Sequence, residues 1–159
     1  MAQSSPQAAA SNGVPLGAPR SMAGKSDGQE TVRGAPRARV MIVEDDALVA
    51  LGIRLTLEEL GYQVVGIAAS ESEAIDLARN STPDLTLMDI RLKGPVDGID
   101  TARRLRSELN LRSVYLSAYT DENTMSRVSA TYPLGFVQKP YSASQLKTAL
   151  ELALRRMGA

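Results

Sequence analysis

Short apolar runs alternate with amphipathic segments along most of the chain. Five runs have the length and composition of buried strands, and they cover residues 40–43, 64–67, 85–88, 114–116 and 135–138. The segments that follow them predict five helices, over about residues 48–60, 71–78, 99–109, 121–131 and 143–156. This alternation predicts an α/β fold, in which a doubly wound five-stranded parallel sheet is covered by helices on both faces.

Local signals mark the ends of several predicted helices. The apolar residues that define the first helix are Leu48, Leu51, Leu55 and Leu57. Gly61 follows them and is expected to end this helix. Ser70 with Glu73, and Ser142 with Gln145, have the spacing of capping boxes, so they are expected to begin the second and fifth helices.

The N-terminal segment has a different composition from the rest of the chain. It is mostly Ala, Ser, Gly, Pro and Gln, without aromatic residues and without hydrophobic periodicity. Such a segment buries too little apolar surface to offset the entropy lost on ordering, so residues 1–37 are predicted to be a disordered tail and residues 38–159 a folded domain. Gly24-Lys25-Ser26 resembles the end of a phosphate-binding loop, but Pro19 stands where that motif needs Gly.

The composition excludes several classes of chemistry. The 159 residues include no His, Cys or Trp, which rules out disulfides, thiolate and imidazole metal ligands, Ser-His-Asp triads and phosphohistidine carriers. Residues 1–39 carry five basic and two acidic groups and residues 40–159 carry 13 and 16, so the zero net charge divides into +3 and −3. The acidic domain disfavours a nucleic-acid partner. No apolar run has the roughly 18–20 residues of a membrane span, and no secretory signal is present, so a cytoplasmic location is predicted.

Polar groups suited to chemistry follow four of the five predicted strands. Glu44 and Asp45 follow the first strand, Asp89 the third, Ser117 the fourth and Lys139 the fifth. Ligands of open parallel sheets bind at the carboxyl ends of the strands, so these groups are expected to meet there. Clustered carboxylates favour a hard divalent cation, Mg²⁺ or Mn²⁺, and a carboxylate can itself act as a nucleophile.

Four short motifs, each at a strand end, resemble the receiver domain of two-component response regulators. They are Val43-Glu44-Asp45-Asp46, Leu87-Met88-Asp89, Leu116-Ser117-Ala118 and Phe136-Val137-Gln138-Lys139-Pro140. The resemblance covers about residues 38–157. It implies a flavodoxin-like (βα)5 fold with the strand order 2-1-3-4-5.

The resemblance also implies a role for each acidic residue. Asp89 would accept a phosphoryl group from a sensor histidine kinase or a phosphotransfer protein. Asp45 and Asp89 would bind Mg²⁺ directly, Glu44 would bind it through water, and Arg91 would contribute its backbone carbonyl. Asp46 has two open interpretations, a neighbour of the metal site or the N-cap of the first helix.

The remaining motif residues are expected to contact the phosphoryl group or to respond to it. Ser117 would donate a hydrogen bond to a phosphoryl oxygen, and Lys139 would pair with another. The peptide bond before Pro140 is expected to be cis. Phe136 stands where many family members have Tyr, and it is interpreted either as a switch residue that moves with Ser117 or as ordinary core packing.

The predicted output is protein–protein contact through the fourth helix, the fifth strand and the fifth helix. The sequence ends about one turn after the last predicted helix, so we expect no output domain. The chain is not expected to be a classical enzyme, although it would promote its own phosphorylation and slow dephosphorylation. A phosphate sink or relay and a non-switching scaffold remain alternatives, and whether phosphorylation produces a homodimer is left open. A haloacid-dehalogenase-type phosphatase is disfavoured, because that class has a second Asp where Arg91 stands.

Overall fold

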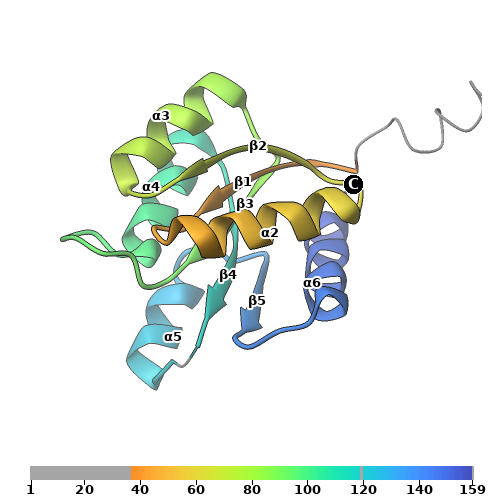
Figure 1. Cartoon of the computed structure of the whole chain (residues 1–159). Coiled ribbons are helices and arrows are strands. Elements are labelled where there is room, and N and C mark those ends of the chain that lie inside the picture. Colours follow the sequence, from red (N-terminus) through yellow and green to blue (C-terminus); the bar gives the residue numbers. More distant parts are fainter. Residues whose placement is uncertain (1–36, 119, 159) are drawn as a thin grey trace, which may run out of the picture. The chain divides into compact units, whose positions relative to one another are not determined.

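The computed structural model describes residues 37–118 and 120–158, so the predicted tail and its Gly24-Lys25-Ser26 motif lie outside the described residues. Strands and helices alternate through the described part (Figure 1). The strands are β1 (Arg39–Val43), β2 (Gln63–Ala68), β3 (Leu85–Asp89), β4 (Ser113–Ser117) and β5 (Gly135–Gln138). The helices are α2 (Ala47–Glu59), α3 (Glu71–Ser81), α4 (Gly98–Leu109), α5 (Glu122–Ser129) and α6 (Ala143–Arg156). The five predicted helices are therefore α2 to α6 in chain order.

The five strands form one parallel sheet in the order β2-β1-β3-β4-β5, which confirms the predicted fold class and strand order. The chain adds β2 on one side of β1 and then returns to place β3 on the other side. The order reverses between β1 and β3, so the carboxyl ends of these two strands form the topological switch point. Ligands of such sheets bind in the crevice outside that point.

Helices cover both faces of the sheet, and each face has its own hydrophobic core (Figure 1). Ile42 and Leu87 point to the face that α2 and α6 cover. Met88 and Tyr115 point to the face that α3, α4 and α5 cover. Successive strand residues point to opposite faces, so residues of the two cores alternate along each strand. The central strands are therefore buried on both sides. None of the described helices is long and apolar enough to cross a membrane.

The two predicted capping boxes differ in the structure. At α6, the box is complete, because the hydroxyl of Ser142 accepts from the amide of Gln145 (3.1 Å) and the Gln145 side chain accepts from the amide of Ser142 (2.8 Å). At α3, the hydroxyl of Ser70 accepts from the amide of Glu73 (3.3 Å). The Glu73 carboxylate, however, accepts from the amide of Ala69 (2.9 Å), one residue before the N-cap. Helix α3 therefore begins where predicted, but Glu73 accepts from the amide of Ala69 and not from that of Ser70.

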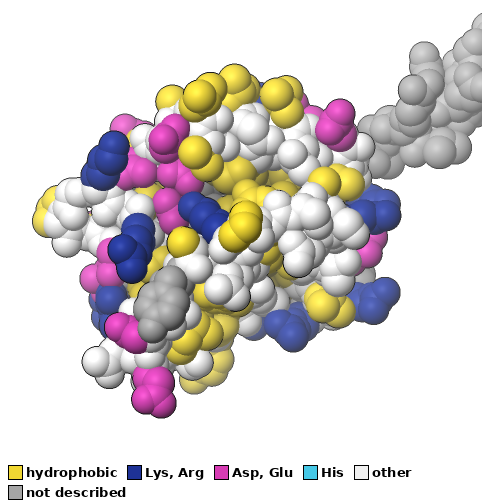
Figure 2. Space-filling model, turned by 60° about the horizontal axis from the view of Figure 1, so that its bottom comes forward, with side chains coloured by type: hydrophobic (Ala, Val, Ile, Leu, Met, Phe, Trp, Pro, Cys, Tyr) yellow, Lys and Arg dark blue, Asp and Glu magenta, His cyan; other side chains and the backbone are white. Residues whose placement is uncertain are grey.

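Helix α2 ends as predicted, since Gly61 has a φ of +94°, a conformation that favours glycine. Of the four leucines that predict this helix, however, only Leu57 lies on its buried face. The residues of α2 that pack into the core are Ala50, Ile53 and Leu57. Leu48, Leu51 and Leu55 are 78%, 46% and 54% exposed. Figure 2 shows hydrophobic side chains at the surface of the domain, and these three leucines are among the large exposed ones.

Candidate functional site

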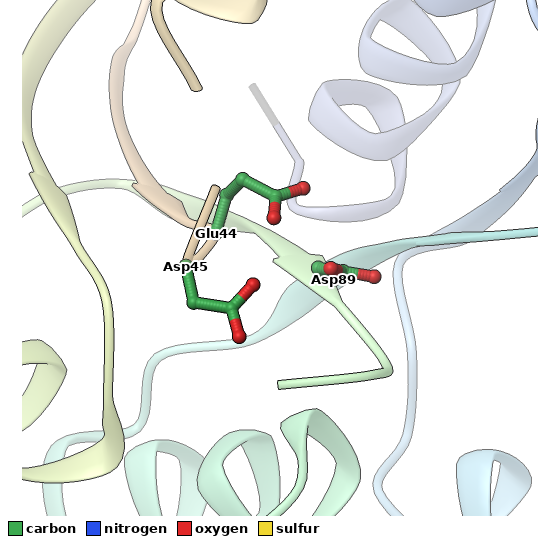
Figure 3. A group of neighbouring side chains, drawn as sticks. All are labelled: Glu44, Asp45 and Asp89. Atoms are coloured by element: carbon green, nitrogen blue, oxygen red, sulfur yellow. The ribbon is translucent and has the colours of Figure 1, made fainter. Parts of the chain in front are cut away.

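Three carboxylates meet at the topological switch point. Glu44 and Asp45 follow β1, and Asp89 is the last residue of β3. One oxygen of each lies within 4.8 Å of the others, which is close enough for all three to share one cation. Figure 3 shows the three side chains side by side at the ends of the two strands. The structure thus brings together the acidic residues that the sequence analysis groups.

The ammonium group of Lys139 lies beside the carboxylates. Lys139 follows β5, and its Nζ is 3.5 Å from Oδ1 of Asp89 and 3.7 Å from Oε1 of Glu44. The amide of Lys139 donates to the carbonyl of Ser117 (2.7 Å), which fixes the ends of β5 and β4 against each other. The side chain of Ser117 is buried at this same edge of the sheet. Three carboxylates and one ammonium give this cluster a formal charge of −2, which a divalent cation would neutralise.

Glu44 is the most perturbed acid of the cluster. Its side chain is only 4% exposed, and burial, helped by the nearby charge of Asp89, raises its pKa to about 7. The amide of Asp46, which donates to Oε2 (3.0 Å), and the ammonium of Lys139 oppose this rise. Among the described residues, Oε1 has no hydrogen-bond partner. A buried carboxylate oxygen without a donor is suited to a cation or a cation-bound water, so these residues fit a divalent metal.

Backbone amides from the loop after β3 contact two of the acids. The amide of Lys93 donates to Oδ2 of Asp45 (2.5 Å), and the amide of Arg91 donates to Oδ1 of Asp89 (3.3 Å). The loop between Asp89 and α4 therefore folds back toward the end of β1. The contact of Lys93 is not predicted from the sequence, because no side-chain pattern reports a backbone donor. The metal-binding role of the Arg91 carbonyl stays a prediction.

Asp46 is the N-cap of α2. Its Oδ1 accepts from the amides of Leu48 (3.0 Å) and Val49 (3.1 Å), as expected for a cap. Its own amide donates to Glu44. Of the two interpretations left open, the structure supports the helix cap, and the cap also helps to orient one acid of the cluster.

Phe136 lies in β5, and Pro140 lies in the loop that follows this strand. Phe136 is half-buried against the core under α3, α4 and α5, and its strand neighbour Tyr115 is fully buried. Phe136 also lines a groove of about 400 Å³ between β5 and α6. The Lys139–Pro140 peptide bond is cis in the structure. The role of Phe136 as a switch stays a prediction.

The arrangement has a clear chemical capability. Asp89 offers a carboxylate oxygen beside an ammonium group and beside oxygens that fit a divalent cation. Positive charge on both sides of a carboxylate lets it approach an anionic electrophile such as a phosphoryl group.

Comparison with known proteins agrees with this geometry. Residues 40–151 match the response regulator receiver domain family. The transcriptional regulatory protein PdtaR of Mycobacterium tuberculosis is 36% identical over 118 residues, which cover 74% of this chain and 57% of PdtaR. The chain thus spans little more than half the length of this curated relative.

Solved structures show the same similarity. The signal receiver domain of a modulated diguanylate cyclase from Desulfovibrio desulfuricans is 37% identical, with a TM-score of 0.70 over 75% of this chain and 94% of that one. A LuxR-family two-component response regulator from an Aurantimonas species is 32% identical, with a TM-score of 0.69 over 75% of this chain and 86% of that one.

The family match covers most of the chain and contains the whole cluster of Glu44, Asp45, Asp89 and Lys139. The fold, the position of the cluster and the match agree with one another. The chain belongs to the response regulator receiver domain family of two-component systems.

Proposed function

We propose that this domain accepts a phosphoryl group on Asp89 from a histidine kinase or phosphotransfer protein, with Mg²⁺ in the acidic cluster, and signals through protein contacts. The observation that carries the proposal is the position of Asp89, whose carboxylate lies among two further acids and 3.5 Å from Lys139. The proposed setting is the cytoplasm.

The proposed transfer moves one phosphoryl group between two proteins. An oxygen of Asp89 attacks phosphorus, an O–P bond forms, and the N–P bond to the donor's imidazole breaks. The electron pair of the broken bond stays on the imidazole, which takes up a proton from solvent. This chain contains no His, so the imidazole must come from the partner.

The residues around Asp89 would bind the metal ion and the phosphoryl oxygens. Asp45 and Asp89 would bind Mg²⁺ or Mn²⁺ directly. Glu44 would bind it through water, and the carbonyl of Arg91 would be a further ligand. The bound ion would supply positive charge next to the transferred phosphoryl group. Lys139 is already close enough to pair with a phosphoryl oxygen on Asp89. Ser117, buried at the same edge, would donate its hydroxyl to another phosphoryl oxygen.

The exposed leucines of α2 are suited to docking the phosphoryl donor. Leu48, Leu51 and Leu55 recur at a spacing that places them on one side of the helix, and all three are solvent-exposed. Leu48 lies in the first turn of α2, directly after the acidic residues that end β1. A partner that brings a phosphohistidine to Asp89 must approach beside this turn, so we assign the apolar stripe to that partner.

The proposed output surface consists of α5, β5 and α6. A phosphoryl group adds about −1.5 to −2 charge and new acceptor oxygens at Asp89. Ser117 and Lys139 connect that point to the ends of β4 and β5, and Phe136 lies two residues before the end of β5. A shift of these residues would change the groove that Phe136 lines, and with it the contacts available to a downstream protein.

The direct test is labelling of the full chain by acetyl phosphate with Mg²⁺, followed by intact-mass measurement. We expect the wild-type chain to gain one phosphoryl group and Asp89→Asn to gain none, while the circular dichroism of both proteins stays the same. Asp76→Asn is the matched control, since Asp76 is an exposed acid on α3 away from the cluster.

Three outcomes would contradict the proposal, and a fourth would favour its alternative, a relay or sink. Label retained on Asp89→Asn would show that another group is the acceptor. Labelling that persists after chelation of divalent cations would remove the metal from the mechanism. A wild-type chain that takes no label from acetyl phosphate or from any histidine kinase would favour a non-switching scaffold. Label that passes back to a phosphotransfer protein without any change in partner binding would identify a relay or sink.

A further inference from the structure

An arginine of α5 reaches across to the start of α4. The Arg127 guanidinium pairs with both carboxylate oxygens of Asp97, with Nη1–Oδ2 and Nη2–Oδ1 distances of 2.9 and 3.1 Å. It also lies 3.3 Å from Oδ1 of Asp100. Two parallel bonds between a planar guanidinium and one carboxylate form the strongest and most directional type of ion pair.

The partner of Arg127 is fixed at the start of α4. Asp97 is the N-cap of this helix, and its Oδ1 accepts from the amide of Asp100 (2.9 Å). Burial alone would raise the pKa of Asp97, but the bonds from Arg127 and from the Asp100 amide outweigh burial, so its pKa lies below the usual range. Asp97 therefore remains charged at neutral pH, and the pair is complete under ordinary conditions.

The start of α4 packs directly on the backbone of Asp89. The amide of Gly98 donates to the carbonyl of Ile90 (2.8 Å). A Cβ atom added at Gly98 would lie 1.9 Å from the carbonyl oxygen of Asp89, so only glycine fits there. Asp97 and Gly98 are consecutive, so we expect a displacement of the backbone at Asp89 to move the carboxylate that Arg127 holds.

Helix α5 has few other anchors. Val128 is its only buried residue. Just beyond its C-terminal end, the hydroxyl of Thr131 is bonded to the hydroxyl of Tyr115 (2.7 Å). The next residue, Tyr132, is also held, because Arg112 donates to its carbonyl (2.8 Å) and the Arg106 guanidinium of α4 lies over its ring. These contacts all lie at or beyond the C-terminal end of α5, whereas Arg127 is the ion-pair link of the helix itself to α4. Loss of this ion pair is therefore expected to free α5 more than it affects any other helix.

We propose that the Arg127–Asp97 ion pair is a latch that couples the backbone of the phosphoryl acceptor to the position of α5. In the unphosphorylated chain the latch holds α5 against the start of α4. Phosphorylation of Asp89 displaces the segment from Asp89 to Gly98 and weakens the pair, which releases α5. Arg127 is a positioning residue in this scheme, and the inference rests on the proposed function of Asp89.

The latch stabilises the unphosphorylated arrangement, so breaking it lowers the free-energy cost of the phosphorylated one. We expect Arg127→Gln to raise the hydrogen-exchange rate of the α5 amides at least fivefold and to raise the rate of labelling by acetyl phosphate threefold to tenfold. Arg127→Lys keeps the charge without the paired geometry and should give intermediate values. Arg54→Gln is the matched control, because Arg54 pairs with Glu58 within α2, away from Asp97 and Asp100 in the sequence, and it should change neither rate.

The second arm removes the other partner. Asp97→Asn keeps an oxygen that can cap α4 but removes the charge. It should reproduce the effects of Arg127→Gln, and the double variant should add little to either single one, as expected for two residues that act through one contact. Additive effects, or Arg127→Gln values equal to wild type, would overturn the latch.

The two readouts separate this inference from the proposed function. Hydrogen exchange of α5 is measured on the unmodified full chain, so it tests the hold on α5 even if no phosphoryl group can be added. A wild-type chain that takes no label contradicts the proposed function. Faster exchange in Arg127→Gln with an unchanged labelling rate contradicts the coupling to Asp89.

Discussion

Helices α2 and α5 begin at the same edge of the sheet but are held in place by different kinds of contact. Helix α2 packs Ala50, Ile53 and Leu57 into the core and is capped by Asp46. Helix α5 buries only Val128 and depends on polar contacts at its surface. Apolar burial resists small displacements, whereas ion pairs can break and form again with little rearrangement of the core. The difference suits α2 to a fixed docking platform and α5 to a responding element.

The largest difference should appear in global stability. Leu57 of α2 is fully buried, so Leu57→Ala is expected to lower the free energy of unfolding by about 2–5 kcal/mol. Val128→Ala removes less apolar volume from a thinly packed helix and should cost about half as much or less. Urea denaturation of both variants measures the comparison. Equal costs would show that α5 is anchored as firmly as α2.

The acidic cluster between the two helices should show its own pH dependence. The pKa of Glu44 is about 7 in the folded chain and 4.5 as its ordinary value. As the pH rises, the unfolded chain therefore loses this proton at a lower pH than the folded chain does. Without metal, the free energy of unfolding should fall between about pH 4.5 and pH 7, by at most about 3 kcal/mol, and stay low above that range.

Denaturation at several pH values with and without Mg²⁺ checks this expectation. Glu44→Gln, which cannot ionise, should lose most of the pH dependence between 5 and 8. Saturating Mg²⁺ favours the ionised carboxylates, so it should stabilise the wild type more at pH 8 than at pH 5. A stability profile that rises through this range without metal would show that Glu44 is not the group responsible.

The smallest effect on stability concerns the apolar stripe on α2, which we propose as the docking site of the phosphoryl donor. Replacement of Leu48 and Leu55 by Ala removes exposed apolar surface, so stability should change by less than about 0.5 kcal/mol. Phosphotransfer from the cognate histidine kinase should slow about tenfold, while the rate with acetyl phosphate should not change, because a small donor needs no docking surface. Leu152→Ala, an exposed leucine on α6, is the matched control. Equal slowing with both donors would place the effect at Asp89 instead.

Much of the fold and of the acidic cluster could be predicted from the sequence. The strands of this sheet are short apolar runs, and their carboxyl ends must share one edge, so Glu44, Asp45, Asp89 and Lys139 could be grouped from their positions after strands. That inference needs only the direction of the strands, not the details of packing.

Other features depend on three-dimensional geometry that no local pattern reports. The amide of Lys93 reaches Asp45 from 48 residues away, and Arg127 meets Asp97 from 30 residues away. The apolar spacing in α2 predicts a helix, but not which side faces the sheet, since its inner face uses Ala50 and Ile53. At α3, the Glu73 carboxylate accepts from the amide of Ala69 and not from that of Ser70, and the sequence cannot distinguish two donors that are one residue apart.

The most direct measurement compares the hydrogen exchange of α2 and α5 in the full chain before and after labelling with acetyl phosphate and Mg²⁺. If Asp89 accepts the phosphoryl group and α5 is the responding element, exchange in α5 should rise severalfold on labelling while exchange in α2 stays constant, and Asp89→Asn should show neither label nor change. Labelled protein with unchanged α5, or with α2 and α5 changed equally, would contradict the account.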